Sequence, residues 1–180
     1  SRGSGFGNAH YELGEVVINL TKTRGAGSLA HEWWHALDNY FARRANVPMG
    51  MVTDSRSIDM RPELRQAYNE LLKMIEKSDF YKRSKAKGDY WGRMHEVTAR
   101  LLAEWVDQSL KAKGEVNTFL SRGADVEKYK QMNYNLYKRA TEVAGETPMP
   151  YEEFAELDAA LDGMPYPTAE EVSEFGSALR

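Results

Sequence analysis

The sequence contains no cysteine. Disulfides, thiolate metal clusters and cysteine nucleophiles are therefore excluded, and any bound metal must be held by His, Asp or Glu side chains. No run of apolar residues approaches the roughly 20 residues that a membrane-spanning helix needs. The net charge of −3 gives no electrostatic reason to expect nucleic acid or an anionic membrane as the main partner.

The chain also lacks an initiator Met and the apolar segment of a signal peptide, since it begins SRGSGFGNAH. We therefore expect a fragment of a longer protein, without a signal peptide. The composition is otherwise ordinary for a globular domain, with 42% hydrophobic and 28% charged residues among 180. That length is sufficient for one compact domain with a hydrophobic core.

The residue pattern predicts an α+β fold that is predominantly α, with a small β element near the N-terminus. Alternating apolar residues over 16–20 indicate a strand, and the glycines that follow lead to Ser28, a residue that can cap a helix. Apolar stripes at helical spacing predict helices over residues 29–44, 62–77, 95–111, 125–145, 151–163 and 168–180. The last of these begins with the capping box Thr168–Glu171.

Residues 81–93 are basic and contain glycine, so their composition favours a loop. Lys82, Arg83, Lys85 and Lys87, with aromatic residues nearby, could contact nucleic acid phosphates. A solvated loop is favoured, because the chain as a whole is acidic. Nucleic acid binding is therefore kept as an alternative and not as the main expectation.

The stretch GSLAHEWWHALDNYF contains the pattern His-Glu-x-x-His at His31, Glu32 and His35. Residues four apart lie on one face of a helix, so both imidazoles can bind one ion, with a zinc–nitrogen distance of about 2.0–2.1 Å. Glu32 can reach a water on that ion without being a ligand, and can take its proton. The motif predicts a zinc peptidase site, because a strand and a glycine turn precede the helix as in zincins. The alternative is that both histidines are hydrogen-bonded polar residues on a partly buried helix.

Two further predictions concern the same helix. Trp33 and Trp34 lie on other faces than the histidines and are predicted to be core residues because of their bulk. Asp38, two turns after His31, is placed to orient a ligand imidazole from behind. A surface salt bridge is an equally good interpretation of Asp38.

A catalytic zinc site needs a third protein ligand. One zincin group supplies a histidine ten residues after the first, but Phe41 occupies that position, so this group is excluded. The remaining candidates lie on the helix predicted at 95–111. Glu96 and Glu104 share a face of that helix, and spacing alone favours Glu96 only slightly.

Three blocks of the sequence resemble, in the same order, the large polyvalent-protein-associated domain first described in very long proteins of phages and conjugative elements. These blocks are INLTKTRGAGSLAHEWWHALDNYF, YWGRMHEVTARLLAEWV and PYPTAEEVSEF. The resemblance extends roughly over residues 8–178. It implies a zincin-like metallopeptidase of the gluzincin type that binds Zn²⁺ and acts as one module of a multidomain protein delivered into a bacterial host.

The resemblance carries further expectations. Residues 1–113 would form the zincin-like metal-binding core, and residues 114–180 a helical C-terminal part packed on it within a single compact domain. The partners would be a protein or peptide substrate, such as a host bacterial protein, and the neighbouring domains of a larger polypeptide. The location would be the bacterial cytoplasm.

The second block usually reads E-x-x-A-R-A-F-E-A-Y in this family, and Glu96, Ala99 and Arg100 match it. The match strengthens Glu96 as the third ligand and makes the role of Glu104 less certain. Arg100 could pair with Glu32 or Glu104, or bind a substrate carboxylate. A plain salt bridge with Glu96, one helical turn away, is a slightly better interpretation.

Peptide hydrolysis would also benefit from a hydrogen-bond donor to the developing oxyanion. Tyr11, His10, His95 and Tyr166 are candidates that the sequence does not separate. Three functions therefore remain for the chain: a zinc endopeptidase, a catalytically inactive zincin-like binding or structural module, and a nucleic-acid-associated domain of a mobile element.

Overall fold

A computed structural model describes residues 9–20, 27–121, 126–161 and 164–176 of the chain. It begins with two short antiparallel strands, β1 (Ala9–Glu12) and β2 (Val17–Leu20), in which Tyr11 lies opposite Ile18. Val16 was predicted to begin the strand, but its φ of 57° places it in the turn between β1 and β2, where it is exposed. The small β element near the N-terminus is thus confirmed, as a hairpin.

Helix α1 (Leu29–Arg44) has the predicted bounds and packs against the hairpin and against α5 (Met94–Ala112). Trp34 is buried in this contact, and its indole Nε1 donates a hydrogen bond to Thr98 Oγ1 at 2.7 Å. Trp33 was predicted to be buried as well but is 51% exposed, because the next position along a helix faces another direction. Ser28 stands at the N-cap position, but its side chain makes no capping hydrogen bond.

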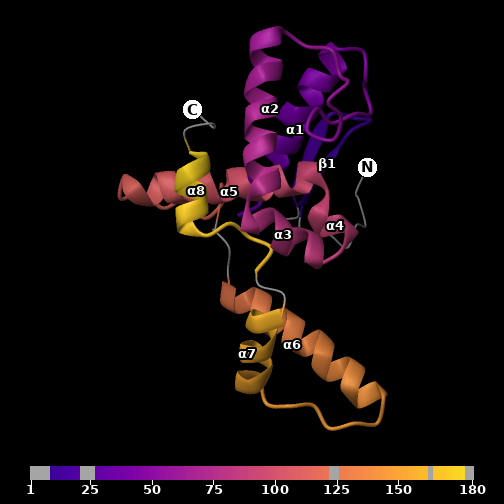
Figure 1. The fold of residues 1–180 in the computed structure, drawn as a ribbon, viewed down its shortest axis with the longest axis vertical. Coiled ribbons are helices and arrows are strands. Elements are labelled where there is room, and N and C mark those ends of the chain that lie inside the picture. Colours follow the sequence, from indigo (N-terminus) through magenta and orange to yellow (C-terminus); the bar gives the residue numbers. More distant parts are fainter. Residues whose placement is uncertain (1–8, 21–26, 122–125, 162–163, 177–180) are drawn as a thin grey trace.

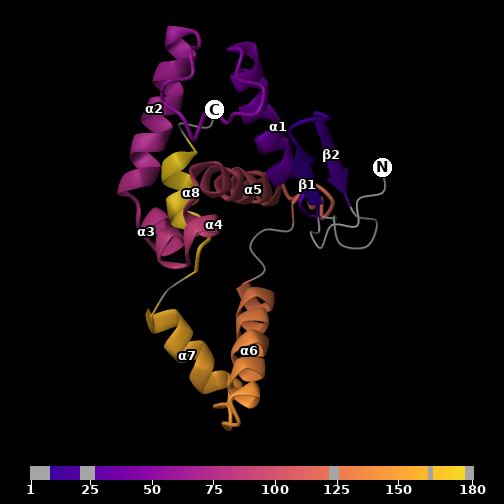
Figure 2. The same cartoon turned by 90° about the vertical axis from the view of Figure 1, so that its right-hand side faces the viewer.

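Helix α2 (Pro62–Lys77) buries the predicted apolar stripe and has proline in its first turn, also as predicted. Figures 1 and 2 show α5 running across the middle of the molecule, with α1 and α2 above it. The apolar core lies among these helices. Its largest fully buried aliphatic and aromatic side chains are Phe80, Phe175, Leu72, Ile75, Leu101, Val52, Val97 and Val172.

The prediction of a loop over residues 81–93 is wrong for most of these residues. Residues 79–92 form two helices, α3 (Asp79–Ala86) and α4 (Asp89–Gly92). They are separated by Gly88, whose φ of 111° lies in the region that favours glycine. The basic composition concealed an amphipathic helix, because α3 buries Phe80 and Ser84 completely beneath its charged face.

Helices α6 (Val126–Val143) and α7 (Tyr151–Leu161) pack on each other and project away from the remaining helices (Figures 1 and 2). Leu136 and Val143 were predicted to lie inside α6 but are 64% and 83% exposed. The reason is that α6 packs on α7, and no other helix of the described residues lies against its opposite face in Figures 1 and 2. The predicted start of α6 at Asp125 lies outside the described residues.

The last helix, α8 (Ala169–Phe175), returns to pack on α5 and buries Val172 and Phe175. Its predicted capping box is confirmed, with Thr168 and Glu171 hydrogen-bonded reciprocally. The C-terminal part therefore packs on the N-terminal part through α8, while α6 and α7 lie apart. The division at residue 113 stays a prediction.

The described residues form a predominantly helical α+β fold, as predicted. Within the described ranges, none of the helices combines the length and the apolar character needed to cross a membrane.

Candidate metal centre

Helix α1 brings His31 and His35 together on one face. Their Nε2 atoms are 3.1 Å apart, and their rings meet edge to face with centroids 4.7 Å apart. His35 is buried, whereas His31 is partly exposed. The two imidazoles therefore lie one helical turn apart on one face of α1, as the sequence predicted.

Helix α5 adds Glu96 to this pair. Glu96 Oε2 lies 3.3 Å from His31 Nε2, and Glu96 Oε1 lies 3.7 Å from His35 Nε2. One ligand atom from each of the three residues lies within 4.8 Å of the others, and no other such group of His, Asp or Glu is found among the described residues. The structure thus brings together His31, His35 and Glu96, which we name the triad, and leaves Glu104 outside it.

Two members of the triad, His31 and Glu96, line a cavity of about 350 Å³. Glu32, the predicted catalytic base, lines this cavity together with His31 and Glu96. Its wall also contains three residues that the sequence suggested for substrate contact or support, namely Arg100, Glu104 and Tyr166, and two that it did not, Tyr90 and Trp91.

Glu96 and His35 have pKa values that favour the protonation states needed to bind a cation. Burial alone would raise the pKa of Glu96, but hydrogen bonding and charge from His31, with His35 and Tyr90, lower it to about 2. Burial and the neighbouring His31 lower the pKa of His35 to about 3. At neutral pH the centre therefore holds an ionised carboxylate and a neutral His35, the forms that bind a metal.

Burial raises the pKa of Glu32, and His31 and a backbone hydrogen bond from Tyr11 only partly oppose this effect. Glu32 is 6% exposed and lines the same cavity as His31 and Glu96. A carboxylate with a raised pKa is a better proton acceptor than an ordinary surface glutamate.

Asp38 does not orient a ligand imidazole, contrary to one interpretation of the sequence. It is fully buried and accepts hydrogen bonds from Thr53 N at 3.1 Å and Thr53 Oγ1 at 2.5 Å. Burial raises the pKa of Asp38 to about 6. The neighbouring Asn39 donates to Pro48 O and Gly50 O, so both residues fix the loop after α1 and not the histidines. The alternative, a surface salt bridge, is also wrong.

Arg100 is 4% exposed and holds the helices around the cavity together. It donates to Trp91 O at 2.5 Å and to Ser84 Oγ at 3.3 Å, and its guanidinium lies over the Trp91 ring. These contacts join α5 to α3 and α4. Tyr166 packs edge to face on Trp91 and completes the same wall.

The sequence did not indicate two residues beside the triad. Tyr90, on α4, hydrogen-bonds Glu96, and burial with this negative charge raises the pKa of Tyr90. Asp54 binds His95 through the ring Nδ1 at 2.5 Å and through the backbone N at 3.2 Å. Asp54 lies in a loop without hydrophobic periodicity, so no sequence signal could have found this contact across 41 residues.

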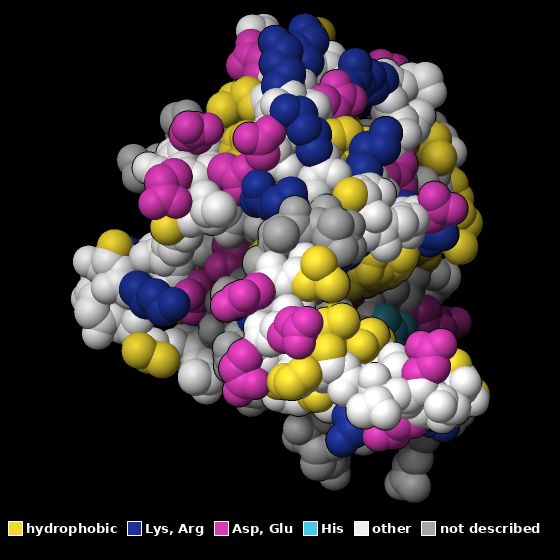
Figure 3. Space-filling model, turned by 60° about the horizontal axis from the view of Figure 1, so that its bottom comes forward, with side chains coloured by type: hydrophobic (Ala, Val, Ile, Leu, Met, Phe, Trp, Pro, Cys, Tyr) yellow, Lys and Arg dark blue, Asp and Glu magenta, His cyan; other side chains and the backbone are white. Residues whose placement is uncertain are grey.

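Two of the basic residues proposed for nucleic acid, Lys82 and Arg83, form ion pairs within the chain. Arg83 binds the Glu171 carboxylate at 2.6 Å and donates to Met164 O and Tyr166 O, so it joins α3 to the C-terminal segment. Lys82 pairs with Asp79 at the surface. Acidic and basic side chains are interspersed over the face shown in Figure 3, without the continuous basic surface that nucleic acid binding favours.

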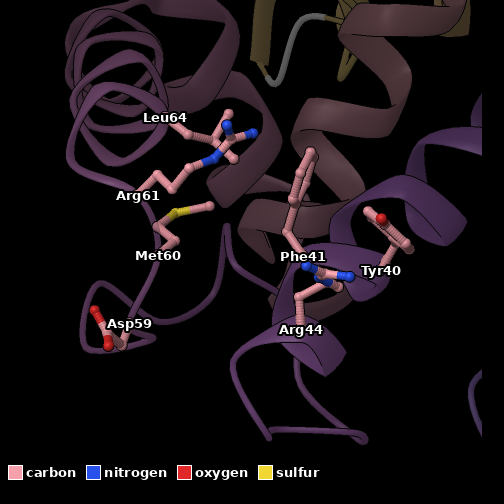
Figure 4. A pocket seen from close by; sticks show the side chains of 7 residues that line it. All are labelled: Tyr40, Phe41, Arg44, Asp59, Met60, Arg61 and Leu64. Carbon is pink, nitrogen blue, oxygen red and sulfur yellow. The ribbon is translucent and has the colours of Figure 1, made fainter.

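A larger cavity, of about 450 Å³, lies between α1 and the start of α2 (Figure 4). Tyr40, Phe41 and Arg44 line it from α1, opposite Arg61 and Leu64. None of the triad residues takes part, and its charged residues are exposed. Cavity size alone therefore does not select a candidate site, whereas the convergence of donor atoms makes the cavity beside the triad the candidate.

The family model of large polyvalent protein-associated domain 1 matches residues 82–180, just over half of the chain. The chain belongs to the large polyvalent protein-associated domain 1 family. As a member, it is a domain associated with the large polyvalent proteins of phages and mobile elements, so it has neighbouring domains in a larger polypeptide.

The matched range includes two of the three blocks that resemble the family, the second with Glu96 and the third at α8. The first block, with His31 and His35, precedes it, so the resemblance expected over residues 8–178 is found from residue 82 onward. Neither a curated protein nor a solved structure matches the chain.

Proposed function

We propose that this domain is a zinc-dependent metallopeptidase module of the gluzincin type within a larger polyvalent protein. The observation that carries the proposal is the convergence of His31, His35 and Glu96 from two helices, beside the buried Glu32 and at the edge of one cavity. The peptidase would act in the cytoplasm of a bacterial host, on a protein or peptide substrate.

The donor atoms of the triad fit a zinc ion in type and in spacing. Ligands 2.0–2.1 Å from a tetrahedral ion are about 3.4 Å from one another. The two imidazole Nε2 atoms are 3.1 Å apart, and His31 Nε2 lies 3.3 Å from Glu96 Oε2, so both distances are close to this value. Glu96 Oε2 is buried and lies 3.3 Å from His31 Nε2, but it has no well-aligned hydrogen-bond partner among the described residues, which is costly unless a cation binds it. Two nitrogens and one oxygen suit zinc, and three protein ligands leave a fourth position open.

When bound, zinc would supply Lewis acidity, which acidifies water and polarises a peptide carbonyl. His31, His35 and Glu96 would bind the ion, and Glu32 would take the proton from the attacking water. The raised pKa of Glu32 suits it for this role and for returning the proton to the leaving amine. The backbone of Tyr11 hydrogen-bonds the Glu32 carboxylate and would help to orient it.

The cavity beside the triad would receive part of an extended peptide. Tyr90, Trp91 and Tyr166 provide apolar and hydrogen-bonding surface on one side of the metal. The volume of about 350 Å³ admits a few side chains and not a folded protein. We therefore expect cleavage within unfolded or exposed segments.

The test is to load the protein with zinc and to compare the wild type with Glu32→Gln. Both should bind one zinc per chain by elemental analysis. Cleavage of a denatured test protein and of a mixed peptide library should fall at least about 10²-fold in the variant, the usual effect of losing a general base. Glu63→Gln, the same change at an exposed position of α2, is the matched control and should cleave like the wild type.

Stoichiometric zinc without cleavage in the wild type would refute the peptidase and support a zincin-like binding or structural module. Equal cleavage by wild type and Glu32→Gln would refute the assignment of the base.

A further inference from the structure

His95 lies between two carboxylates at the start of α5. Its ring Nδ1 is 2.5 Å from Asp54 Oδ2, and its backbone N donates to Asp54 Oδ1 at 3.2 Å. Its ring Nε2, on the opposite side, is 3.7 Å from Glu96 Oε1. One carboxylate thus holds both the ring and the helix terminus, and fixes the direction in which Nε2 faces Glu96.

The two oxygens of Glu96 have different surroundings. Oε2 is the oxygen nearer His31, and it lacks a hydrogen-bond partner among the described residues. Oε1 lies 3.7 Å from both His35 Nε2 and His95 Nε2. A carboxylate that binds a metal through one oxygen commonly has its other oxygen held by a neighbouring group. The arrangement leaves Oε2 for the ion and Oε1 for His95.

His95 is not part of the donor group, which consists of one atom each from His31, His35 and Glu96. Its ring packs against His35, with centroids 5.5 Å apart. Asp54 and His95 line a cavity of about 640 Å³ that includes no member of the triad. Asp54 and His95 therefore lie beside the triad but face a different cavity from the one that Glu32 lines.

We infer that the Asp54–His95 pair is a positioning device, which keeps Glu96 a ligand through Oε2 by the ion pair, at 3.7 Å, between His95 Nε2 and Oε1. This inference rests on the proposed metal centre. His95 acts through Glu96, and Asp54 acts through His95. Asp54 is itself held in place by its loop. Asp38 accepts two hydrogen bonds from Thr53, the residue before Asp54, and thereby fixes this loop.

The experiment measures zinc affinity by competition with a chromophoric chelator, and coordination by the visible absorption of the Co²⁺-loaded protein. His95→Ala should weaken zinc binding about 10- to 100-fold, the usual effect of losing a partner behind a ligand. Its Co²⁺ absorption should fall, because Glu96 is then free to bind through both oxygens and a tetrahedral ion gains a ligand. His95→Gln, whose amide also places an N–H donor beside Oε1, should retain affinity closer to the wild type.

The control is Thr98→Ala, which removes another buried hydrogen bond between α1 and α5 without touching the triad. It should leave both readouts unchanged. In a Glu96→Gln background, His95→Ala should cost no further affinity, because the two residues act as one unit.

Wild-type affinity and absorption in His95→Ala would overturn the inference. So would an additive loss in the double variant, or an equal loss in Thr98→Ala. A wild type that binds no zinc would instead refute the metal centre itself, and with it the proposed function.

Discussion

Replacement of Glu96 by Gln should weaken zinc binding by about 10²- to 10³-fold. The change removes a charged ligand and keeps the size of the side chain. Glu96 is 8% exposed, and its pKa of about 2 means that it is ionised without a metal. A complete four-ligand zinc site provides roughly 10–16 kcal/mol, or about 3–4 kcal/mol for each ligand. At about 1.4 kcal/mol for each factor of ten, the expected loss follows.

Glu104→Gln provides the matched comparison. Glu104 lies on the same helix, is 9% exposed and lines the same cavity, but it is outside the triad. Its replacement should change the affinity less than about tenfold, since its charge would act on the ion only through space.

Zinc affinity would be measured at constant pH with a competing chelator, after metal removal. Thermal melting of the metal-free proteins would establish that each variant is folded. The reasoning would be refuted if Glu96→Gln bound zinc like the wild type, or if Glu104→Gln lost as much affinity. The second result would make Glu104 the third ligand and would mean that the α1–α5 geometry differs in the metal-bound state.

Two further predictions concern stability. Because the pKa of Asp38 is raised to about 6, folding favours its protonated form, so its contribution is complete below about pH 4 and is lost as the pH rises through 6. The stability of the metal-free wild type, relative to Asp38→Asn in chemical unfolding, should therefore fall by about 3 kcal/mol between pH 4 and 7, and a rise would contradict this. Arg83→Met should lower the free energy of unfolding by about 2 kcal/mol, because it breaks a partly buried ion pair with Glu171. Lys82→Met, which breaks an exposed pair with Asp79, should change it by less than about 1 kcal/mol, and equal losses would refute the structural role of Arg83.

Helices with a regular apolar stripe could be predicted from the sequence, and those whose burial depends on distant partners could not. The bounds of α1 and α2 follow from periodicity and from Pro62. The positions of Leu136 and Val143 on α6 look equally apolar, yet both are exposed, because burial needs a facing element that the sequence does not specify. Helix α3 was missed because its buried residues are few, among them Phe80 and Ser84, within a basic segment.

The site divides in the same way. His31, Glu32 and His35 form a local pattern on one helix. Their spacing in the sequence therefore determines how their side chains lie relative to one another. Glu96 could only be ranked above Glu104, since both lie on one face of α5, and the crossing angle of α1 and α5 decides which one meets the histidines. Asp54 could not be found at all, because its contact with His95 depends on how a loop folds after α1.

That loop connects the stability of the fold to the geometry of the metal centre. Asp38 and Asn39 are buried polar residues of α1, and their hydrogen bonds are directed to the loop that follows and not to the triad. Buried polar groups are costly unless they are fully bonded, so they define one loop conformation more sharply than apolar packing would. The conformation they define places Asp54 at the start of α5, against His95. Two sets of contacts thus position the histidines of α1 relative to the glutamate of α5. One is the direct packing of the two helices, and the other is the series of hydrogen bonds that joins Asp38 to Thr53 and Asp54 to His95. For the proposed metal centre, this double constraint would keep the three ligand atoms within the small positional errors that a metal site tolerates.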